Sequence, residues 1–221
     1  MSRFTLIGAA VVALTLLLVA PSTAASPSCA RPAGPLVIGL KKQVACLKKQ
    51  VASLTAENAR LKSNRVRFDI TEERGAIIPG GTAVAKDAGT GETISLTASG
   101  EARPSAHKAA GGGTFARSNG ATTIVSGIWY VTGFVSWTPA GGTVGGAVDG
   151  IGQLSEASAG LLVLNVHLVP DAGAPSDGTL TVHCNLGVDE QITGEEGVSL
   201  TIGSLRFEQA GGATLFHRGG S

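Results

Sequence analysis

The chain has 221 residues, of which 17 are Lys or Arg and 16 are Asp or Glu, so its net charge is +1. Glycine is abundant, at 32 residues, whereas aromatic residues make up only 4%. This composition argues against a large helical core, because an interior glycine costs a helix about 1 kcal/mol relative to alanine. It is typical of a β-rich domain with many tight turns, and the length allows one compact domain plus an appendage.

Residues 1–25 are predicted to be a cleaved secretory signal peptide. Arg3 supplies the early positive charge, residues 6–20 form an uncharged and mostly apolar run, and Pro21 ends that run. Small residues at positions 22–24 provide the cleavage site. A retained membrane anchor is the alternative, but the apolar run is short for a span of about 20 residues. We therefore expect a secreted protein, extracellular or cell-surface-associated, with no transmembrane segment in the mature chain.

Three cysteines, Cys29, Cys46 and Cys184, lie in the mature chain, where they would meet an oxidising compartment. Their spacing fits no zinc motif, and an odd number leaves one thiol free or paired between chains. Cys184 falls in an apolar alternation that predicts a buried thiol. We favour no intramolecular disulfide, although the sequence leaves the state of all three cysteines open.

Charge is divided unevenly along the chain. Residues 30–67 carry nine basic side chains and one acid, a net charge of +8, whereas residues 68–221 carry a net charge of −8. The basic segment suits contact with an anionic cell-surface polymer, or it forms a solvated helix face, which is the commoner role. Nucleic acid is not an expected partner, because no aromatic residues interleave with these basic side chains.

Residues 37–63 follow a linker (26–36) and are predicted to form a coiled-coil helix. Apolar residues and one asparagine alternate at spacings of four and three: Leu40, Val44, Leu47, Val51, Leu54, Asn58 and Leu61. The segment resembles a leucine zipper over about three heptads. Leucine at d with valine at a favours two parallel strands, and Asn58 at an a position would pair with its own copy and define the register. We expect a dimer or trimer through these residues; the alternative is a helix packed on the chain's own body.

Residues 66–221 are predicted to form an all-β domain of about eight short strands. Clean alternation marks residues 65–70 and 93–98 as strands, whereas residues 102–118 are small, polar and glycine-rich and indicate a loop. Residues 122–138 are too long for one flat strand, so we expect a bend or turn at Gly127 or Gly133.

The strongest predicted hairpin joins residues 161–169 to residues 179–188, with apolar residues on one face of each strand. Residues 198–202 and 205–207 form a further pair whose change of phase predicts a bulge near Gly203. Short strands with regular turn signals indicate an antiparallel β-sandwich or β-barrel. The sequence does not separate these two architectures.

No motif assigns chemistry to the chain. His167 and His183 lie on the polar face of the predicted hairpin and would be neighbours in one register, but no third metal ligand is evident. His107 and His217 lie in a predicted loop and tail and indicate nothing. Paired carboxylates such as Glu195–Glu196 fall in predicted turns, and no nucleophile elbow or phosphate-binding loop occurs. We therefore expect no catalytic residue, no metal site and no cofactor.

These features together predict a secreted, non-enzymatic binding or structural protein, whose β-domain is presented on a short oligomerising coiled coil. Two alternatives stay open. The first is a β-barrel that holds a small apolar ligand in its interior. The second is a hydrolase or isomerase built on the same β scaffold, because a fold by itself does not define an activity.

Overall fold

The computed structural model of the protein describes residues 36–142, 144–186 and 195–219. The predicted signal peptide, and the predicted linker up to residue 35, lie outside the described residues. The chain divides into two units, Met1–Ala52 and Ser53–Ser221, and each unit is described by itself. Among the described residues, no helix is both long enough and apolar enough to cross a membrane.

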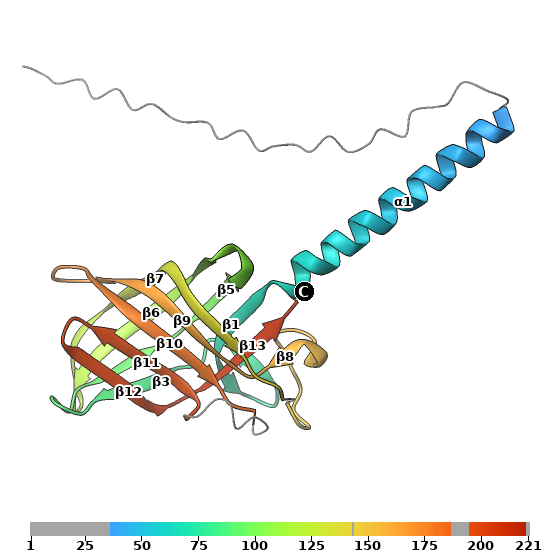
Figure 1. Cartoon of the computed structure of the whole chain (residues 1–221). Coiled ribbons are helices and arrows are strands. Elements are labelled where there is room, and N and C mark those ends of the chain that lie inside the picture. Colours follow the sequence, from blue (N-terminus) through green and yellow to red (C-terminus); the bar gives the residue numbers. More distant parts are fainter. Residues whose placement is uncertain (1–35, 143, 187–194, 220–221) are drawn as a thin grey trace, which may run out of the picture. The chain divides into compact units, whose positions relative to one another are not determined.

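One α-helix, α1 (Leu36–Ser63), covers the segment that carries the heptad pattern (Figure 1). The segment is rich in Leu, Lys, Gln and Ala, which are strong helix formers, and it contains no proline. Its side chains are described from residue 40 to residue 56. The pairing of α1 with a second helix stays a prediction.

Thirteen β-strands follow in the described part of the chain, with two short 3-10 helices between them. The strands are β1 (Val66–Glu73), β2 (Ile77–Pro79), β3 (Ala83–Asp87), β4 (Thr93–Leu96), β5 (Ser99–Arg103), β6 (Lys108–Asn119), β7 (Thr122–Pro139), β8 (Ala157–Ser158), β9 (Gly160–Pro170), β10 (Ser176–Cys184), β11 (Gly197–Ile202), β12 (Leu205–Gly211) and β13 (Ala213–Arg218). The 3-10 helices are η1 (Pro104–Ala106) and η2 (Leu154–Glu156).

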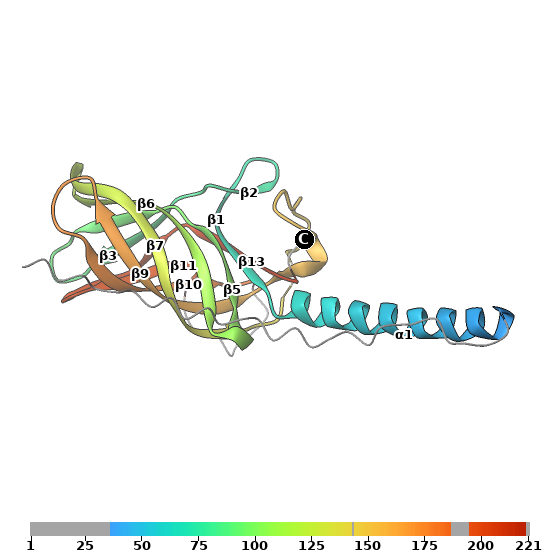
Figure 2. The ribbon, with the colours of Figure 1, turned by 90° about the horizontal axis from the view of Figure 1, so that it is seen from above.

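Eight of these strands close into an antiparallel β-barrel (Figures 1 and 2). The order around the ring is β3, β4, β6, β7, β9, β10, β11, β12 and back to β3. The ring closes because β4 pairs with β6 from Thr93↔Ser118 to Leu96↔Phe115. The all-β prediction is confirmed, and of the two architectures that the sequence left open, the barrel is the one that forms.

The other five strands extend the sheet beyond the ring. β5 pairs with β6, and β1, β13 and β8 follow it in that order, while β2 pairs with β1. β13 reaches back to the ring, where the Thr214 hydroxyl donates a 2.6 Å hydrogen bond to the carbonyl oxygen of His183 in β10. Side chains of the ring and of this extension belong to one hydrophobic core.

Alternation along the strands builds that core. The predicted hairpin forms as β9 and β10 with Leu164 opposite Leu180, and both side chains are fully buried. Their outward neighbours Asn165 and Thr181 lie on the other face of the sheet. Each fully buried Leu, Ile, Val or Phe side chain stabilises the fold by about 1.5–3 kcal/mol relative to its exposed state.

Strand β6 corrects the sequence analysis, which assigned residues 102–118 to a loop. The glycines of β6 reflect close backbone contacts rather than turns. A Cβ at Gly113 would collide with the carbonyl oxygen of Thr97, and a Cβ at Gly112 would collide with that of Trp129. Glycine inside a strand often marks such an approach, but the sequence alone does not distinguish it from a loop.

The long strand β7 and the hairpin of β11 and β12 settle two further expectations. β7 is one continuous strand whose register shifts between Val131 and Gly133, so the predicted bend at Gly133 is confirmed. The predicted bulge near Gly203 is wrong. Gly203, with φ of 57°, lies in the turn between the two strands, and the irregularity of β12 falls later, between Gln209 and Gly211.

Candidate functional site

The predicted oligomerisation residues all lie on α1, and the side chains of five of the seven are described. These five are exposed: Leu40 60%, Val44 45%, Leu47 50%, Val51 62% and Leu54 64%. Asn58 and Leu61 belong to the helix, but their side chains lie outside those described. Residues three and four apart share one face of a helix, so the five side chains form a single apolar stripe, here called the seam.

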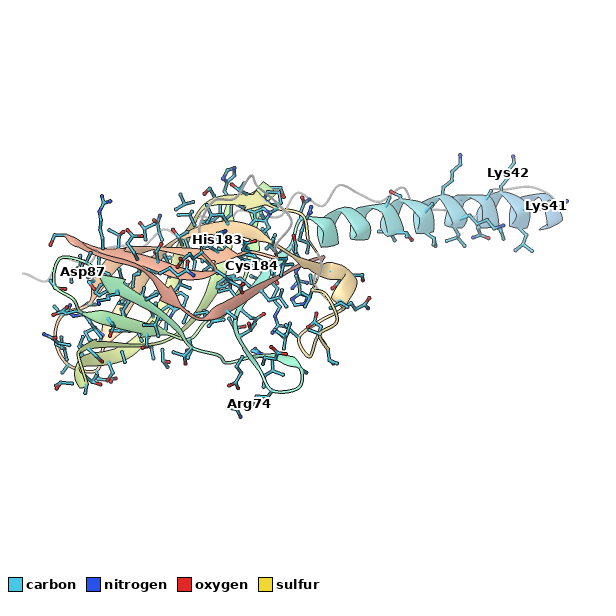
Figure 3. The ribbon with its side chains drawn as sticks, turned by 90° about the horizontal axis from the view of Figure 1, so that it is seen from below. Lys41, Lys42, Arg74, Asp87, His183 and Cys184 are labelled. Atoms are coloured by element: carbon cyan, nitrogen blue, oxygen red, sulfur yellow. The ribbon has the colours of Figure 1, made fainter. Side chains whose placement is uncertain are left out.

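The lysines of α1 favour a parallel pairing of such helices. Lys41 and Lys48 fall at e positions of the heptad, and Figure 3 labels Lys41 beside Lys42 at the start of the helix. In a parallel pair an e residue faces the g residue five positions earlier on the partner, so Lys48 would face Gln43 and Lys41 would face Leu36, and no like charges would meet. The charges beside the seam would therefore not oppose a parallel arrangement, and the pairing itself stays a prediction.

The cysteines follow the sequence analysis only in part. Cys46 is disulfide-bonded, so the expectation of no intramolecular bridge is wrong. Cys46 occupies a c position of the heptad, away from the seam, which leaves the a and d side chains exposed for pairing. Cys184 is a buried free thiol, as its apolar alternation predicted. Cys29 lies outside the described residues.

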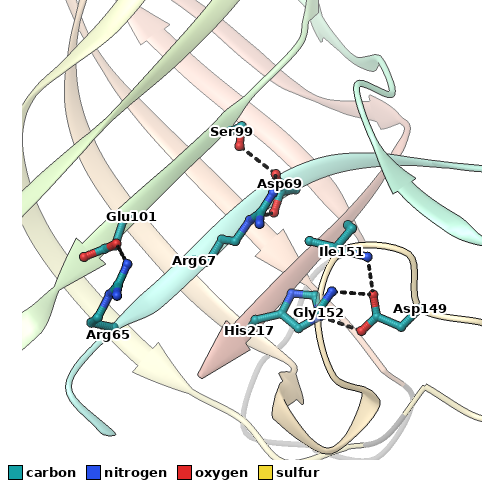
Figure 4. Close-up of polar contacts among 9 residues, drawn as sticks. All are labelled: Arg65, Arg67, Asp69, Ser99, Glu101, Asp149, Ile151, Gly152 and His217. Atoms are coloured by element: carbon teal, nitrogen blue, oxygen red, sulfur yellow. Dashed lines mark hydrogen bonds and ion pairs between the residues drawn. The ribbon is translucent and has the colours of Figure 1, made fainter. Parts of the chain in front are cut away.

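A buried hydrogen bond in the barrel unit joins the side chains of Asp149 and His217 (Figure 4). The Nε2–H of His217 donates to Asp149 Oδ2 at 2.6 Å, and both side chains are 2% exposed. The backbone N–H groups of Ile151 and Gly152 donate to the other carboxylate oxygen at 2.8 and 3.2 Å. Burial acts to raise the pKa of Asp149, but these three hydrogen bonds outweigh it, so the pKa lies below its ordinary value.

This pair holds the segment before β8 against β13. Asp149 also forms an isolated bridge with Ile77, and Gly152 lies so close to the imidazole of His217 that a Cβ there would touch the ring. His217 Nδ1 is buried without a hydrogen-bond partner among the described residues. The sequence analysis found nothing in His217, because its partner lies 68 residues away in the chain.

A second polar cluster surrounds His183 at the end of β10 (Figure 3). His183 Nδ1–H donates to the carbonyl oxygen of Glu195 at 2.7 Å, which leaves the lone pair on Nε2 without a partner among the described residues. Glu196 accepts a 2.9 Å hydrogen bond from the backbone N–H of Thr214. Burial raises the pKa of Glu196, while the hydrogen bond from Thr214 and the nearby His183 partly oppose that rise.

This cluster therefore holds a carboxyl whose pKa is raised, Glu196, and an imidazole nitrogen, His183 Nε2, without a partner among the described residues. It does not offer a nucleophile, because burial and the neighbouring Glu196 raise the pKa of Cys184 to about 12. No group of three or more metal-ligating side chains gathers anywhere in the described ranges.

The raised pKa of Glu196 predicts that its contribution to the stability of the folded protein decreases as the pH rises. A raised folded-state pKa favours folding most below the ordinary value of about 4.3, and this contribution is lost as the pH rises through the folded-state pKa. We expect Glu196→Gln, which keeps the acceptor for Thr214, to raise the melting temperature at pH 7 by about 2 °C and to change it little at pH 4. Calorimetry at both pH values tests this, with the exposed neighbour Glu195→Gln as control; a destabilised variant at pH 7 would contradict it.

The two histidines of the predicted hairpin do not meet. The register places His167 opposite Asp177 and His183 opposite Leu161, at different ends of the strands. His167 Nδ1 forms a 2.7 Å contact with the exposed carboxylate of Asp177 instead. The register that would have joined the histidines is therefore excluded.

Comparison with known proteins adds no information about this site. The chain matches no known protein family, no curated protein and no solved structure.

Proposed function

We propose that this protein is a secreted, non-enzymatic binding or structural protein whose β-barrel is presented in two copies by pairing of α1. The observation that carries the proposal is the exposed seam on α1, with five large apolar side chains at heptad spacing. Exposed apolar patches of this kind are uncommon on monomeric proteins and mark interaction sites. The partner that fits a heptad stripe is a second heptad stripe, and the chain itself supplies one.

The choice of a second copy rests on three features of α1. Valine at the a positions with leucine at d favours two strands, and the polar Asn58 at a third a position is satisfied by its own copy. In a parallel pair Gln43 at g would oppose Lys48 at e, and Glu57 at g would oppose Lys62 at e, so the helices would not repel each other. A helix of 28 residues also exceeds the length of about 15 below which isolated helices are marginal.

Pairing would change what the protein can bind. Two linked barrels engage a repeated target with an avidity that exceeds the affinity of either barrel, without any new contact. Pairing would also bring two copies of Lys41, Lys42, Lys48 and Lys49 together. An anionic cell-surface polymer is the class of partner that suits this positive charge.

Light scattering on the mature protein tests the pairing. We expect the wild type to be a dimer and Leu47→Asp/Leu54→Asp to be a monomer, because two carboxylates in each seam would be buried next to their copies. The matched control is Ala45→Asp/Ala52→Asp, which adds the same charge at two exposed b positions and should leave the dimer intact.

Circular dichroism of the strands accompanies this measurement, so that loss of folding is not mistaken for loss of pairing. Asn58→Val is a further variant; it should stabilise the assembly and allow trimers, because the one polar register-setting layer is gone. A monomeric wild type, or a double seam variant that remains a dimer, would overturn the proposed assembly.

The alternative of an apolar ligand inside the barrel gains no support from the packing. The inward side chains of the ring, among them Leu164, Leu180 and Phe207, are fully buried against one another. Interiors packed in this way leave little free volume. The pockets that the described residues line are instead open to solvent at the surface of the domain, not enclosed in the barrel interior.

A further inference from the structure

Strands β6 and β7 pair along only part of their lengths. β6 pairs with β7 only from Gly112 to Asn119, whereas its first residues pair with β5 alone. β7 continues past Tyr130 paired with β9 alone. The two strands therefore separate at the residues of β6 that precede Gly112 and the residues of β7 that follow Tyr130. A cavity of about 510 Å³ lies between these two segments and is here called the wedge.

The wedge has an apolar inner side and a cationic rim. Phe134 and Ala109 are partly buried and pack against the hydrophobic core, so they form its inner side. Arg103 and Lys108, which pair across β5 and β6, lie exposed at the rim. A cavity with an apolar body and a few convergent charges is the usual form of a small-molecule site.

The rim is organised before any ligand arrives. One carboxylate oxygen of Glu101 accepts a 2.8 Å hydrogen bond from Nε of Arg103. The other carboxylate oxygen forms an ion pair with Arg65 (Figure 4). Burial tends to raise the pKa of Glu101, but the two arginines outweigh it and lower the pKa, so the carboxylate stays charged and holds Arg103 in place. Two arginines and Lys108 against one carboxylate leave this rim positively charged.

The far end of the wedge is bounded by a ring contact. His107 packs edge-on against Phe134, with ring centroids 5.8 Å apart. The backbone of His107 has φ of 49°, the only positive value at a non-glycine residue in the described part of the chain. Strain of this kind is concentrated at functional sites. Because the wedge is bounded by the pairing of β6 with β7 at one end and by this contact at the other, it suits a small molecule better than an extended peptide.

We infer that the wedge binds a small monocarboxylate with an apolar body, with the carboxylate at Arg103 and Lys108 and the body against Phe134 and Ala109. Arginine holds carboxylates with short, charge-assisted hydrogen bonds, and the guanidinium of Arg103 is already anchored through Nε to Glu101. This site lies within the barrel unit and does not depend on pairing of α1.

Isothermal titration calorimetry of the mature protein tests the inference with three matched probes. These are 3-phenylpropanoate, the corresponding alcohol and the corresponding amine, which differ only in the polar group. We expect saturable binding of the carboxylate, weaker binding of the alcohol by about fivefold or more, and no binding of the amine, because charge-assisted hydrogen bonds are about twice as strong as neutral ones. Equal binding of the amine, or no saturable binding of the carboxylate at millimolar concentration, would overturn it.

Two variants locate the site. Arg103→Gln/Lys108→Gln should weaken carboxylate binding by about tenfold or more and leave the alcohol unchanged. Lys86→Gln/Arg206→Gln removes the same charge from exposed positions on β3 and β12 and should bind as the wild type does. Ala110→Leu, at an exposed lining position, should block both the carboxylate and the alcohol. If Arg103→Gln/Lys108→Gln bound 3-phenylpropanoate with unchanged affinity, the carboxylate would bind elsewhere and the inference would be refuted. This result would not depend on whether the protein is a monomer or a dimer.

Discussion

Replacement of Asp149 by alanine is expected to lower the free energy of unfolding by about 3–5 kcal/mol, because it leaves a buried imidazole without its partner. Both side chains of the Asp149–His217 pair are 2% exposed, so water does not replace the lost contact. The backbone N–H groups of Ile151 and Gly152 lose their acceptor at the same time. Urea unfolding of the variant and the wild type at pH 7 measures the difference.

The same pair predicts that the free energy of unfolding depends on pH in the acidic range. The lowered pKa of Asp149 means that its contribution to stability is present above the ordinary value of about 3.9 and is lost as the pH falls through the folded-state pKa. The stability difference between wild type and Asp149→Asn should therefore be largest at neutral pH and should shrink below pH of about 4. A difference that grows on acidification would show that the carboxylate is not held charged by His217.

A double-mutant cycle separates the pair from its surroundings. Asp149→Asn and His217→Gln should each destabilise the protein, and the double variant should cost less than the sum of the two, because the second change removes a group that the first has already left unpaired. Additive effects would mean that the two side chains contribute independently. Asp171→Asn, at an exposed carboxylate, serves as a control with an expected change below about 0.5 kcal/mol.

Phe216→Ala is expected to cost about 3–5 kcal/mol, comparable to other fully buried phenylalanines. Phe216 on β13 lies opposite Phe68 of β1, and both are fully buried. Its ring also stacks edge-on against Trp137 of β7, with centroids 4.7 Å apart, so it joins the five-strand extension to the ring. The cavity left by alanine would lie where these two parts of the sheet share their core.

Thermal unfolding followed by tryptophan fluorescence checks this expectation, because Trp137 reports on the contact directly. Val148→Ala is the control; its side chain is 63% exposed, and we expect a change below about 0.5 kcal/mol. If Phe216→Ala cost no more than this control, the extension would not be packed on the barrel as described.

Local patterns in the sequence predicted the elements that depend on a single period. The heptad of α1 and the hairpin of β9 and β10 follow from spacings of 3.5 and 2, which the chain carries without help from distant residues. The inward faces of that hairpin are confirmed by the burial of Leu164 and Leu180. The bend in β7 near Gly133 followed from length alone, since a flat strand of that size is rare.

Local patterns failed where a residue is chosen for its distant neighbour. Gly112 and Gly113 indicated a loop, yet they are glycines because the backbones of Trp129 and Thr97 approach them. His217 carried no signal, because Asp149 is brought to it only by the folding of the segment before β8. Whether His167 and His183 would be neighbours depended on the register of β9 with β10, which the sequence left open and which the turn between them helps to set.

The sequence by itself determined that this chain is an all-β domain preceded by a helix with an apolar stripe at heptad spacing, because both follow from the periodicity of apolar residues. Only the tertiary structure decided that the sheet closes into a barrel rather than a sandwich. Closure depends on the pairing of β4 with β6. The apolar and polar alternation of a strand shows which face is buried but does not show which other strand pairs with its edge. The wedge is likewise a product of strand pairing, because β6 pairs with β7 only from Gly112 to Asn119 and the residues of β6 before Gly112 pair with β5 alone.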